Sequence, residues 1–209
     1  MIIKAFVQAR MSSKRFPGKI LAPFKGKPLI QNVLEKITTV FSTEDVIVLT
    51  STEISDDPLA AFLFSKEKNV FRGSLTNVAK RFREALEVYP CDWFVRICAD
   101  SPLLDPNLIK TMMNLSLTDA DIVTNVFPRS FPKGFSVEMV RVSVFMSLNL
   151  DKFDKEDEEH VTSFFYKNSN IFKIKNLDNI HGDKSHNNFC VDTIEDYHRL
   201  NLGYDVEVT

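Results

Sequence analysis

The chain opens with I-I-K-A-F-V over residues 2–7, followed by Q-A-R-M-S-S-K-R-F-P-G-K over residues 8–19. The first run is short, apolar and β-branched, which predicts a β-strand. The second run is rich in small and basic residues and contains the turn signal Pro17-Gly18. Apolar residues at helical spacing follow from Ile30 to Phe41, with Pro28 near the start. This opening therefore predicts a strand, a basic loop and a helix, in that order.

The alternation of strand and helix continues to about residue 125. We expect strands over 45–50, 70–71, 92–99 and 120–124, and helices starting near 56, after a cap at Ser74 or Thr76, and over 106–117. Such alternation is typical of an α/β protein with helices on both faces of its sheet. Beyond Asn125 the pattern loosens. There we expect a loop over 127–134, strands over 136–140, 171–174 and 189–191, and helices over 141–150, over 156–167 and from Thr193 or Ile194.

Composition narrows the class of protein. The chain has 209 residues, a net charge of −2 and 44 % apolar residues, which is typical of a soluble globular domain. It is neither a strongly basic nucleic-acid binder nor an acidic disordered chain. No apolar run approaches the length of about 18 residues that a membrane-spanning helix needs. Three widely spaced Cys give no disulfide framework, so we expect a cytoplasmic protein with reduced thiols and no membrane or nucleic-acid partner.

The distribution of charge is more informative than its sum. Residues 1–34 carry seven Lys or Arg and no acidic residue, so the remaining chain has a net charge of −9. A concentrated positive segment of this kind predicts an anionic ligand. A solvated basic loop is the alternative reading of the same segment.

Several common motifs are missing. The six Gly form no G-x-G pair and no phosphate-binding G-x-x-x-x-G-K-[ST], which excludes the dinucleotide fingerprint and the Walker loop. The sequence also lacks G-x-S-x-G, C-x-x-C and H-E-x-x-H, so a serine hydrolase of the α/β type and a zinc site are not expected.

Two acidic residues follow predicted strands. Asp100 comes directly after the strand over 92–99, and Asp192 comes directly after the strand over 189–191. Ligands of open α/β sheets bind beyond the carboxyl ends of the strands, where the basic loop also lies. Two carboxylates facing a phosphate-binding loop suit Mg²⁺, which is commonly held by one or two carboxylates and substrate phosphates. A cap or turn role is the alternative for each Asp taken alone.

At these residues the chain resembles a known family. Seven blocks match in order: residues 8–30, 51–60, 70–82, 95–106, 125–134, 159–162 (E-H-V-T) and 191–196 (V-D-T-I-E-D). They resemble the cytidylyltransferases that activate acidic sugars, a family that includes CMP-KDO synthetase and acylneuraminate cytidylyltransferase. The likeness is closest to the branch of spore coat polysaccharide biosynthesis protein F.

The resemblance implies a three-layer α/β/α nucleotidyltransferase fold, similar to glycosyltransferase A, with a mostly parallel central sheet. It implies one domain over 1–209, with a nucleotide-binding half to about 125 and an acceptor and dimerisation half from about 126. The implied reaction is transfer of CMP from CTP to a sugar with release of pyrophosphate and with Mg²⁺ as cofactor. A homodimer is also implied.

The same resemblance assigns site residues. The nucleotide would be bound by Ala9, Arg10, Ser12, Ser13, Arg15, Lys19, Ser51, Arg72, Gly73, Asn77 and Asp100. Arg15, Lys19 and Asp100 would be catalytic, and Asp100 and Asp192 would hold the metal. The acceptor would be bound by Arg129, Lys133, Glu138 and His160.

The acceptor half departs from the family pattern. The branch usually has F-P-D-G-x-D-V-E, whereas residues 131–138 read F-P-K-G-F-S-V-E. Lys133 and Ser136 thus replace two acidic residues, and we expect a more anionic acceptor; neutral drift is the alternative.

Two other functions stay open. Asp119 and Asp121 form a D-x-D pattern, which would suit a nucleotide-sugar glycosyltransferase, although a turn between a helix and the following strand explains it better. A non-catalytic nucleotide-binding homologue is the second alternative.

Overall fold

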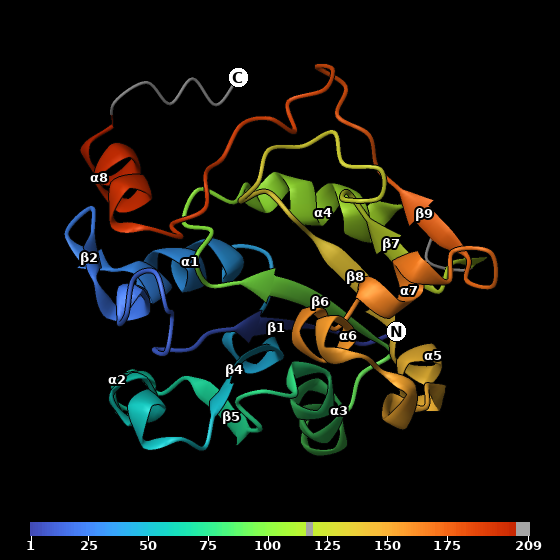
Figure 1. Cartoon of the computed structure of the whole chain (residues 1–209), viewed down its shortest axis with the longest axis horizontal. Helices are drawn as coiled ribbons and strands as arrows, with labels where there is room; N and C mark the ends of the chain where they lie inside the picture. The colour runs from blue at the N-terminus through green and yellow to red at the C-terminus, as the bar shows by residue number, and fades with distance from the viewer. Residues whose placement is uncertain (116–118, 204–209) are drawn as a thin grey trace.

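The computed structural model describes residues 1–115 and 119–203 of the chain. Its centre is a seven-stranded sheet with the strand order β5-β4-β1-β6-β8-β7-β9 (Figure 1). The strands are β1 Ile3–Gln8, β4 Val46–Ser51, β5 Asn69–Gly73, β6 Trp93–Cys98, β7 Ile122–Thr124, β8 Glu138–Arg141 and β9 Ile174–Asn176. Within this sheet only β8 runs antiparallel to its neighbours. The predicted mostly parallel α/β fold is confirmed.

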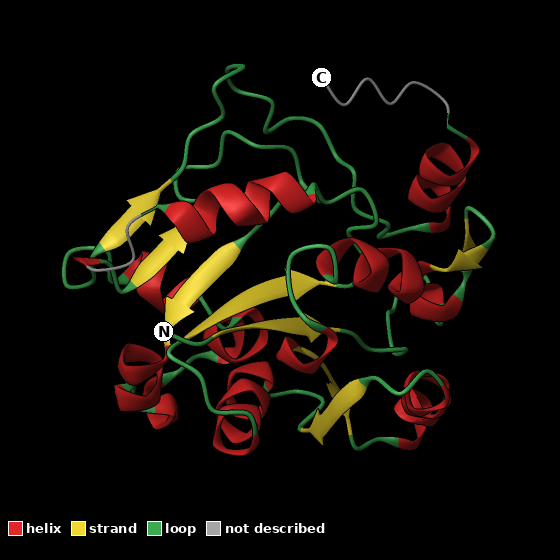
Figure 2. Cartoon of the chain, turned by 180° about the vertical axis from the view of Figure 1, so that it is seen from behind, coloured by secondary structure: helices red, strands yellow, loops and turns green. Residues whose placement is uncertain are grey.

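Helices cover both faces of the sheet, which makes three layers (Figures 1 and 2). One face packs against α1 Leu29–Ile37, α2 Asp57–Ser65, α4 Pro106–Asn114 and α8 Ile194–Leu202. The other packs against α3 Val78–Val88, α5 Val142–Ser147 and α7 Ser163–Lys167, with α6 Lys155–His160 beside α3. Smaller elements are the hairpin of β2 Pro23–Phe24 and β3 Lys27–Pro28, and the 3₁₀ turns η1 Lys19–Leu21, η2 Thr43–Asp45, η3 Ile54–Asp56 and η5 Leu150–Lys152.

Strand residues divide between the two cores because successive side chains of a strand point to opposite faces. In β1, Ala5 and Val7 are buried against the first group of helices, whereas Phe6 is buried against the second. The strands are therefore apolar on both faces, as expected of a sheet covered on both sides.

Parallel pairing brings the carboxyl ends of β1, β4, β5 and β6 to one edge of the sheet. The basic loop leaves β1 at this edge, and Asp100 follows β6 there. A segment from the far end of the chain joins them, because the Val191 amide donates to the Asp100 carbonyl at 2.8 Å. The antiparallel β8 starts at the same edge, where Glu138 lies opposite Arg96 of β6.

Several predicted elements are wrong in their details. The helix predicted over 156–167 is two helices, α6 and α7, separated at Val161, whose backbone φ is 59°. The strand predicted over 189–191 is an extended segment, because its amides bond to two different partners, the carbonyls of Lys133 and Asp100. The strand predicted over 171–174 lies instead at Ile174–Asn176.

Helix ends also differ from the prediction. Helix α3 is capped by Asn77, whose side-chain oxygen accepts from the Lys80 amide, and not by Ser74 or Thr76. The helix expected over 106–117 ends at Asn114, and Leu117 lies outside the described residues. The helix expected over 141–150 ends at Ser147 and is followed by the 3₁₀ turn η5. None of the described helices is long and apolar enough to cross a membrane.

Candidate active site

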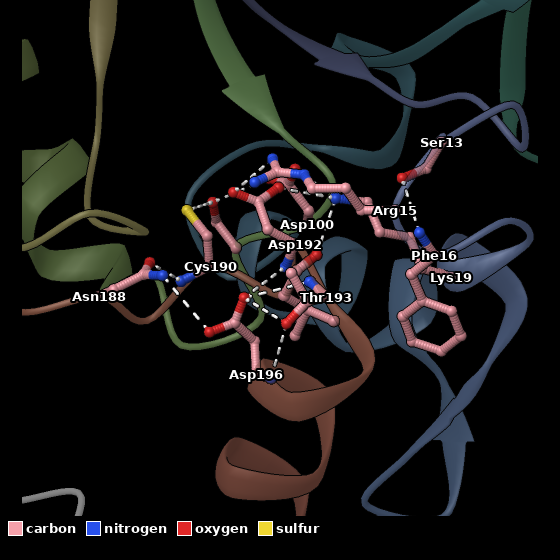
Figure 3. A network of polar contacts seen from close by, with 12 residues as sticks. Ser13, Arg15, Phe16, Lys19, Asp100, Asn188, Cys190, Asp192, Thr193 and Asp196 are labelled. Carbon is pink, nitrogen blue, oxygen red and sulfur yellow. Dashed lines mark hydrogen bonds and ion pairs between the residues drawn. The ribbon is translucent and has the colours of Figure 1, made fainter.

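Lys19 lies at the centre of a cluster of charged groups beyond the carboxyl ends of β1 and β6 (Figure 3). Its Nζ donates to Asp100 Oδ2 at 2.9 Å, to the Val191 carbonyl at 2.7 Å and to Asp192 Oδ1 at 3.2 Å. Only 6 % of the residue is exposed. Burial alone would lower the pKa of Lys19, but the two carboxylates outweigh it and raise that pKa above 10.5, so the ammonium stays charged.

The basic loop presents Lys19 through a glycine turn. Gly18 has a φ of 74°, a conformation that favours glycine, and its amide donates to the Met11 carbonyl at 2.9 Å. This bond closes the loop just before Lys19 enters η1. The Ser13 hydroxyl accepts from the Phe16 amide at 3.4 Å, while Ser12 is exposed.

Asp192 is held at the start of α8. A capping box joins Thr193 and Asp196, and the Asp192 amide also donates to Asp196 Oδ2 at 3.3 Å. The Asp192 carboxylate is thereby directed toward the loop, where its Oδ2 lies 3.1 Å from Arg15 Nη2. The fold thus brings together Arg15, Lys19, Asp100 and Asp192, four residues that the sequence analysis assigned to one site.

Two further nucleotide candidates contact α6. The Arg10 guanidinium pairs with Glu159, with Nη2–Oε1 at 2.5 Å and Nη1–Oε2 at 3.4 Å. The Asn77 side-chain amide donates to Glu158 Oε1 at 2.8 Å. Sequence reasoning missed Glu158 and Glu159 as site residues, although Glu159 begins the E-H-V-T block that supported the resemblance.

The remaining nucleotide candidates lie at the ends of β1, β4 and β5. Ala9 is buried, and its amide donates to the Leu49 carbonyl. Arg72 Nε donates to the Ser51 carbonyl at 2.8 Å. Gly73 is closely packed, because a Cβ there would lie 3.0 Å from the Cγ of Arg81, which would have to shift.

Asp56 connects this region to the basic loop. It is fully buried and accepts from the Ser51 amide at 3.0 Å, from the Ser51 hydroxyl and from the Met11 amide at 2.7 Å. The sequence around Asp56 predicts only the start of a helix, because nothing local signals a contact with Met11.

The four acceptor candidates do not share one environment. Glu138 is buried with Arg96, and its Oε1 accepts from the hydroxyls of Thr162 and Tyr166, each at 2.6 Å. Burial would raise the pKa of Glu138, but Arg96 and the two hydroxyls outweigh it and lower that pKa below its ordinary value. His160 is exposed at the end of α6.

Arg129 and Lys133 lie in the loop between β7 and β8. Arg129 Nη1 donates to the Ser136 hydroxyl at 3.1 Å, within its own loop. The Lys133 side chain is exposed, and its backbone pairs with residues 187–189. None of the contacts between described residues joins either side chain to Lys19, Asp100 or Asp192.

Comparison with known proteins identifies the family of this site. The sequence model of the cytidylyltransferases matches residues 4–201. The chain belongs to the cytidylyltransferase family. The resemblance inferred from the motifs is confirmed, and with it the class of enzyme, a nucleotidyltransferase.

Similar proteins cover nearly the whole chain of this cytidylyltransferase. Spore coat polysaccharide biosynthesis protein SpsF of Bacillus subtilis is 26 % identical over 204 residues, 95 % of this chain and 84 % of SpsF. The solved structure of a cytidylyltransferase from Leptospira borgpetersenii is 31 % identical, with a TM-score of 0.90 over 99 % of this chain and 89 % of that one. CMP:2-keto-3-deoxy-manno-octonic acid synthetase, solved with CTP, shares the fold at 17 % identity, with a TM-score of 0.71 over 97 % of this chain and 98 % of that one.

The D-x-D pattern of this cytidylyltransferase lies away from the site. Asp121 comes directly before β7, and Asp100 follows β6. Because β7 runs parallel to β6, the two residues lie at opposite edges of the sheet. Asp121 Oδ2 accepts from the Lys173 amide at 2.9 Å, and the Lys173 ammonium pairs with Asp119. These contacts give both carboxylates a structural role at the start of the strand.

The donor set of the site fits a hard divalent cation that is completed by its substrate. Asp100 and Asp192 both contact one nitrogen, Lys19 Nζ, so their carboxylates are close together. Among the described residues there is no group of three His, Cys, Asp or Glu that could hold a metal without further ligands. Two carboxylates with substrate phosphates are a common Mg²⁺ site.

Proposed function

We propose that this cytidylyltransferase transfers CMP from CTP to an acidic sugar, with release of pyrophosphate and with Mg²⁺ as cofactor. The observation that carries the proposal is the position of Lys19 between Asp100 and Asp192, at the end of a loop that supplies further cations. The fold places this cluster where ligands of open α/β sheets bind. The proposed product would serve the synthesis of a surface polysaccharide or glycan.

The nucleotide-binding half would extend to about residue 125. Arg10, Ser13, Arg15 and Lys19 lie on one loop and would bind the triphosphate. Ser51, Arg72 and Gly73 lie at the ends of β4 and β5, and Asn77 caps α3; these four residues would lie near the base and ribose. A distant relative with the same fold has been solved with CTP, which supports CTP as the nucleotide.

Asp100 and Asp192 would hold Mg²⁺, which neutralises phosphate charge and lowers the pKa of a bound hydroxyl. The carboxylates now balanced by Lys19 and Arg15 would then pair with the metal. The side chains of Lys19 and Arg15 would become available to the phosphates.

A sugar hydroxyl would attack the α-phosphorus of CTP. The new oxygen–phosphorus bond forms as the bond to the bridging oxygen of pyrophosphate breaks, and the hydroxyl proton passes to solvent. Such transfers depend mainly on positioning and on neutralising charge. Lys19 and Arg15 would stabilise the charge that accumulates on pyrophosphate.

The acceptor half would comprise residues from about 126. Glu138 and His160 lie next to the turn between α6 and α7, and Arg129 and Lys133 lie in the loop before β8. Lys133, at a position that is usually acidic in the branch, and Arg129 in the same loop support a more anionic acceptor. The homodimer implied by the resemblance stays a prediction.

Two measurements test the proposal. The first is the melting shift with CTP, UTP, ATP or GTP, each with and without MgCl₂; a ligand at 100 times its Kd adds about 2.7 kcal/mol. We expect a shift selective for CTP with Mg²⁺. The second is pyrophosphate release with CTP and KDO, N-acetylneuraminic acid or neutral mannose, in which the two acids should react faster.

Other outcomes would change the assignment. Equal rates with acidic and neutral sugars would contradict an anionic acceptor. Hydrolysis of a nucleotide sugar without pyrophosphate release would indicate a glycosyltransferase. Nucleotide binding without turnover on any sugar would support a non-catalytic homologue.

A further inference from the structure

Residues 158–162, the bridge segment, comprise the last turn of α6 and the turn that leads into α7, and they contact both halves of the site. On the nucleotide side, Glu159 meets two nitrogens of Arg10, and Glu158 accepts from Asn77 at 2.8 Å. On the acceptor side, Thr162 donates to Glu138 at 2.6 Å. Three side chains of the bridge segment thus contact the loop after β1, the N-terminal cap of α3 and the start of β8.

The middle of the bridge segment is strained. Val161 has φ 59° and ψ −51°, and the Thr162 amide donates to the His160 carbonyl at 2.5 Å. These values describe a γ-turn with positive φ, a rare conformation that is disfavoured for a β-branched residue. Val161 is fully buried, so the surrounding structure holds it in this conformation. Strain of this kind persists where neighbouring contacts over-determine the backbone, and it is frequent near functional sites.

The turn at Val161 separates the contacts on the nucleotide side from those on the acceptor side. Helix α6 ends at His160, just after Glu158 and Glu159, which contact Asn77 and Arg10. Helix α7 begins directly after the hydroxyl that contacts Glu138. The local helical pattern of residues 156–167 is therefore overridden in favour of contacts on both sides of the site.

Arg10 needs such support. Its side chain is 34 % exposed, and that of Glu159 is 33 % exposed, so neither is fixed by burial alone. A partly exposed arginine without a partner samples several rotamers, and ordering it on ligand binding costs affinity. The guanidinium has five N–H donors, so a contact with Glu159 through two nitrogens leaves others for a phosphate.

We propose that Glu159 is a positioning residue, which orients the Arg10 guanidinium for the triphosphate, and that the strained turn keeps Glu159 in place. This inference rests on the proposed function, since it concerns the affinity for CTP. It assigns no contact between Glu159 and the nucleotide. The effect of Glu159 on the Kd of CTP must therefore depend on the presence of Arg10.

The test is a double-mutant cycle on the full chain, read out as the Kd of CTP with MgCl₂ by titration calorimetry. Glu159→Gln should raise the Kd about fivefold, the size expected for a partly exposed ion pair. In an Arg10→Ala background the same change should alter the Kd less than about twofold. Glu156→Gln is the matched control, because Glu156 lies on the same helix and pairs with Lys167.

The results of this cycle support or overturn the role proposed for Glu159. Tighter CTP binding by Glu159→Gln would show that Glu159 competes with the phosphate, and would overturn the inference. An equal loss in both backgrounds would indicate a merely structural role and would also overturn it. If Glu159→Gln unfolds, Glu159→Asp, which keeps the charge, should lose affinity only in the presence of Arg10. Wild-type protein that binds no CTP would overturn the proposed function as well, and this distinguishes the two failures.

Discussion

Replacing Lys19 with Met removes the positive charge between two carboxylates while nearly conserving the volume of the side chain. Breaking a fully buried ion pair costs about 3–5 kcal/mol, whereas an exposed pair contributes about 0–1 kcal/mol. The Lys19 side chain is 8 % exposed, and those of Asp100 and Asp192 are 25 % and 33 % exposed. The cluster therefore lies between these limits, and Lys19→Met should lower the free energy of unfolding by about 2–3 kcal/mol.

The loss can be measured by urea denaturation and by melting. For a chain of this length, 1 kcal/mol shifts Tm by about 2–4 °C, so Tm should fall by about 4–12 °C. Lys27→Met is the control, because its pair with Glu35 is about half exposed and should contribute less than about 1 kcal/mol.

The same variant tests whether Lys19 neutralises the repulsion between the carboxylates of Asp100 and Asp192. Without the ammonium, Asp100 and Asp192 repel each other, and a divalent cation should relieve that repulsion. MgCl₂ alone should therefore raise the Tm of Lys19→Met more than that of the wild type. Pyrophosphate release should fall by about 10²-fold or more, as for the loss of other electrostatic donors. A loss of stability below about 1 kcal/mol, together with equal effects of MgCl₂ on both proteins, would refute this account of Lys19.

Further predictions concern other parts of the site. Asp100→Asn should reduce the rate of pyrophosphate release by about 10²-fold with little change in the Kd of CTP; weakened affinity with intact turnover would argue against a metal role. Glu138→Gln leaves the buried Arg96 without its carboxylate and should cost about 3 kcal/mol in urea denaturation near neutral pH. Because the folded-state pKa of Glu138 lies below 4.5, its contribution is present above that pH and is lost as pH falls through the folded pKa, so the two proteins should converge in acid. Val161→Gly should be no less stable than Val161→Ala, although Gly normally costs about 1 kcal/mol more, because Gly tolerates positive φ.

The parts of the site that could be predicted are those that follow strands. Periodicity and apolar runs located β1, β4 and β6, and the chemistry of strand ends then placed the basic loop and Asp100 at one edge. Asp192 could be predicted for the same reason, although its segment is extended rather than a strand. Its position depends on the capping box of α8, which the T-x-x-D spacing from Thr193 to Asp196 also indicates.

The parts that could not be predicted depend on contacts between distant residues. Residues 156–167 satisfy a helical pattern locally, but the chain turns at Val161, next to the bond from Thr162 to Glu138, which is 24 residues away in sequence. The pairing of Arg10 with Glu159 spans 149 residues. A pattern over one or two helical turns contains no information about such partners. The resemblance therefore assigns Glu138 to the site but does not predict its buried network with Arg96, Thr162 and Tyr166.

The fold assembles the cluster of Lys19, Asp100 and Asp192 without any ligand. Lys19 is 81 residues from Asp100 and 173 from Asp192, so only the folded sheet brings the three together. With Arg15 included, two positive charges balance two negative ones, and the cluster is neutral without any ligand. A nucleoside triphosphate with one divalent cation carries a net negative charge, so it would draw on Lys19, Arg15 and the other cations of the loop as the carboxylates pair with the metal. Groups that are already oriented need little reorganisation during the reaction, and this preorganisation is usually the largest part of electrostatic catalysis. The contact between Lys19 and the two carboxylates is thus the feature that joins the stability of the fold to the chemistry proposed for it.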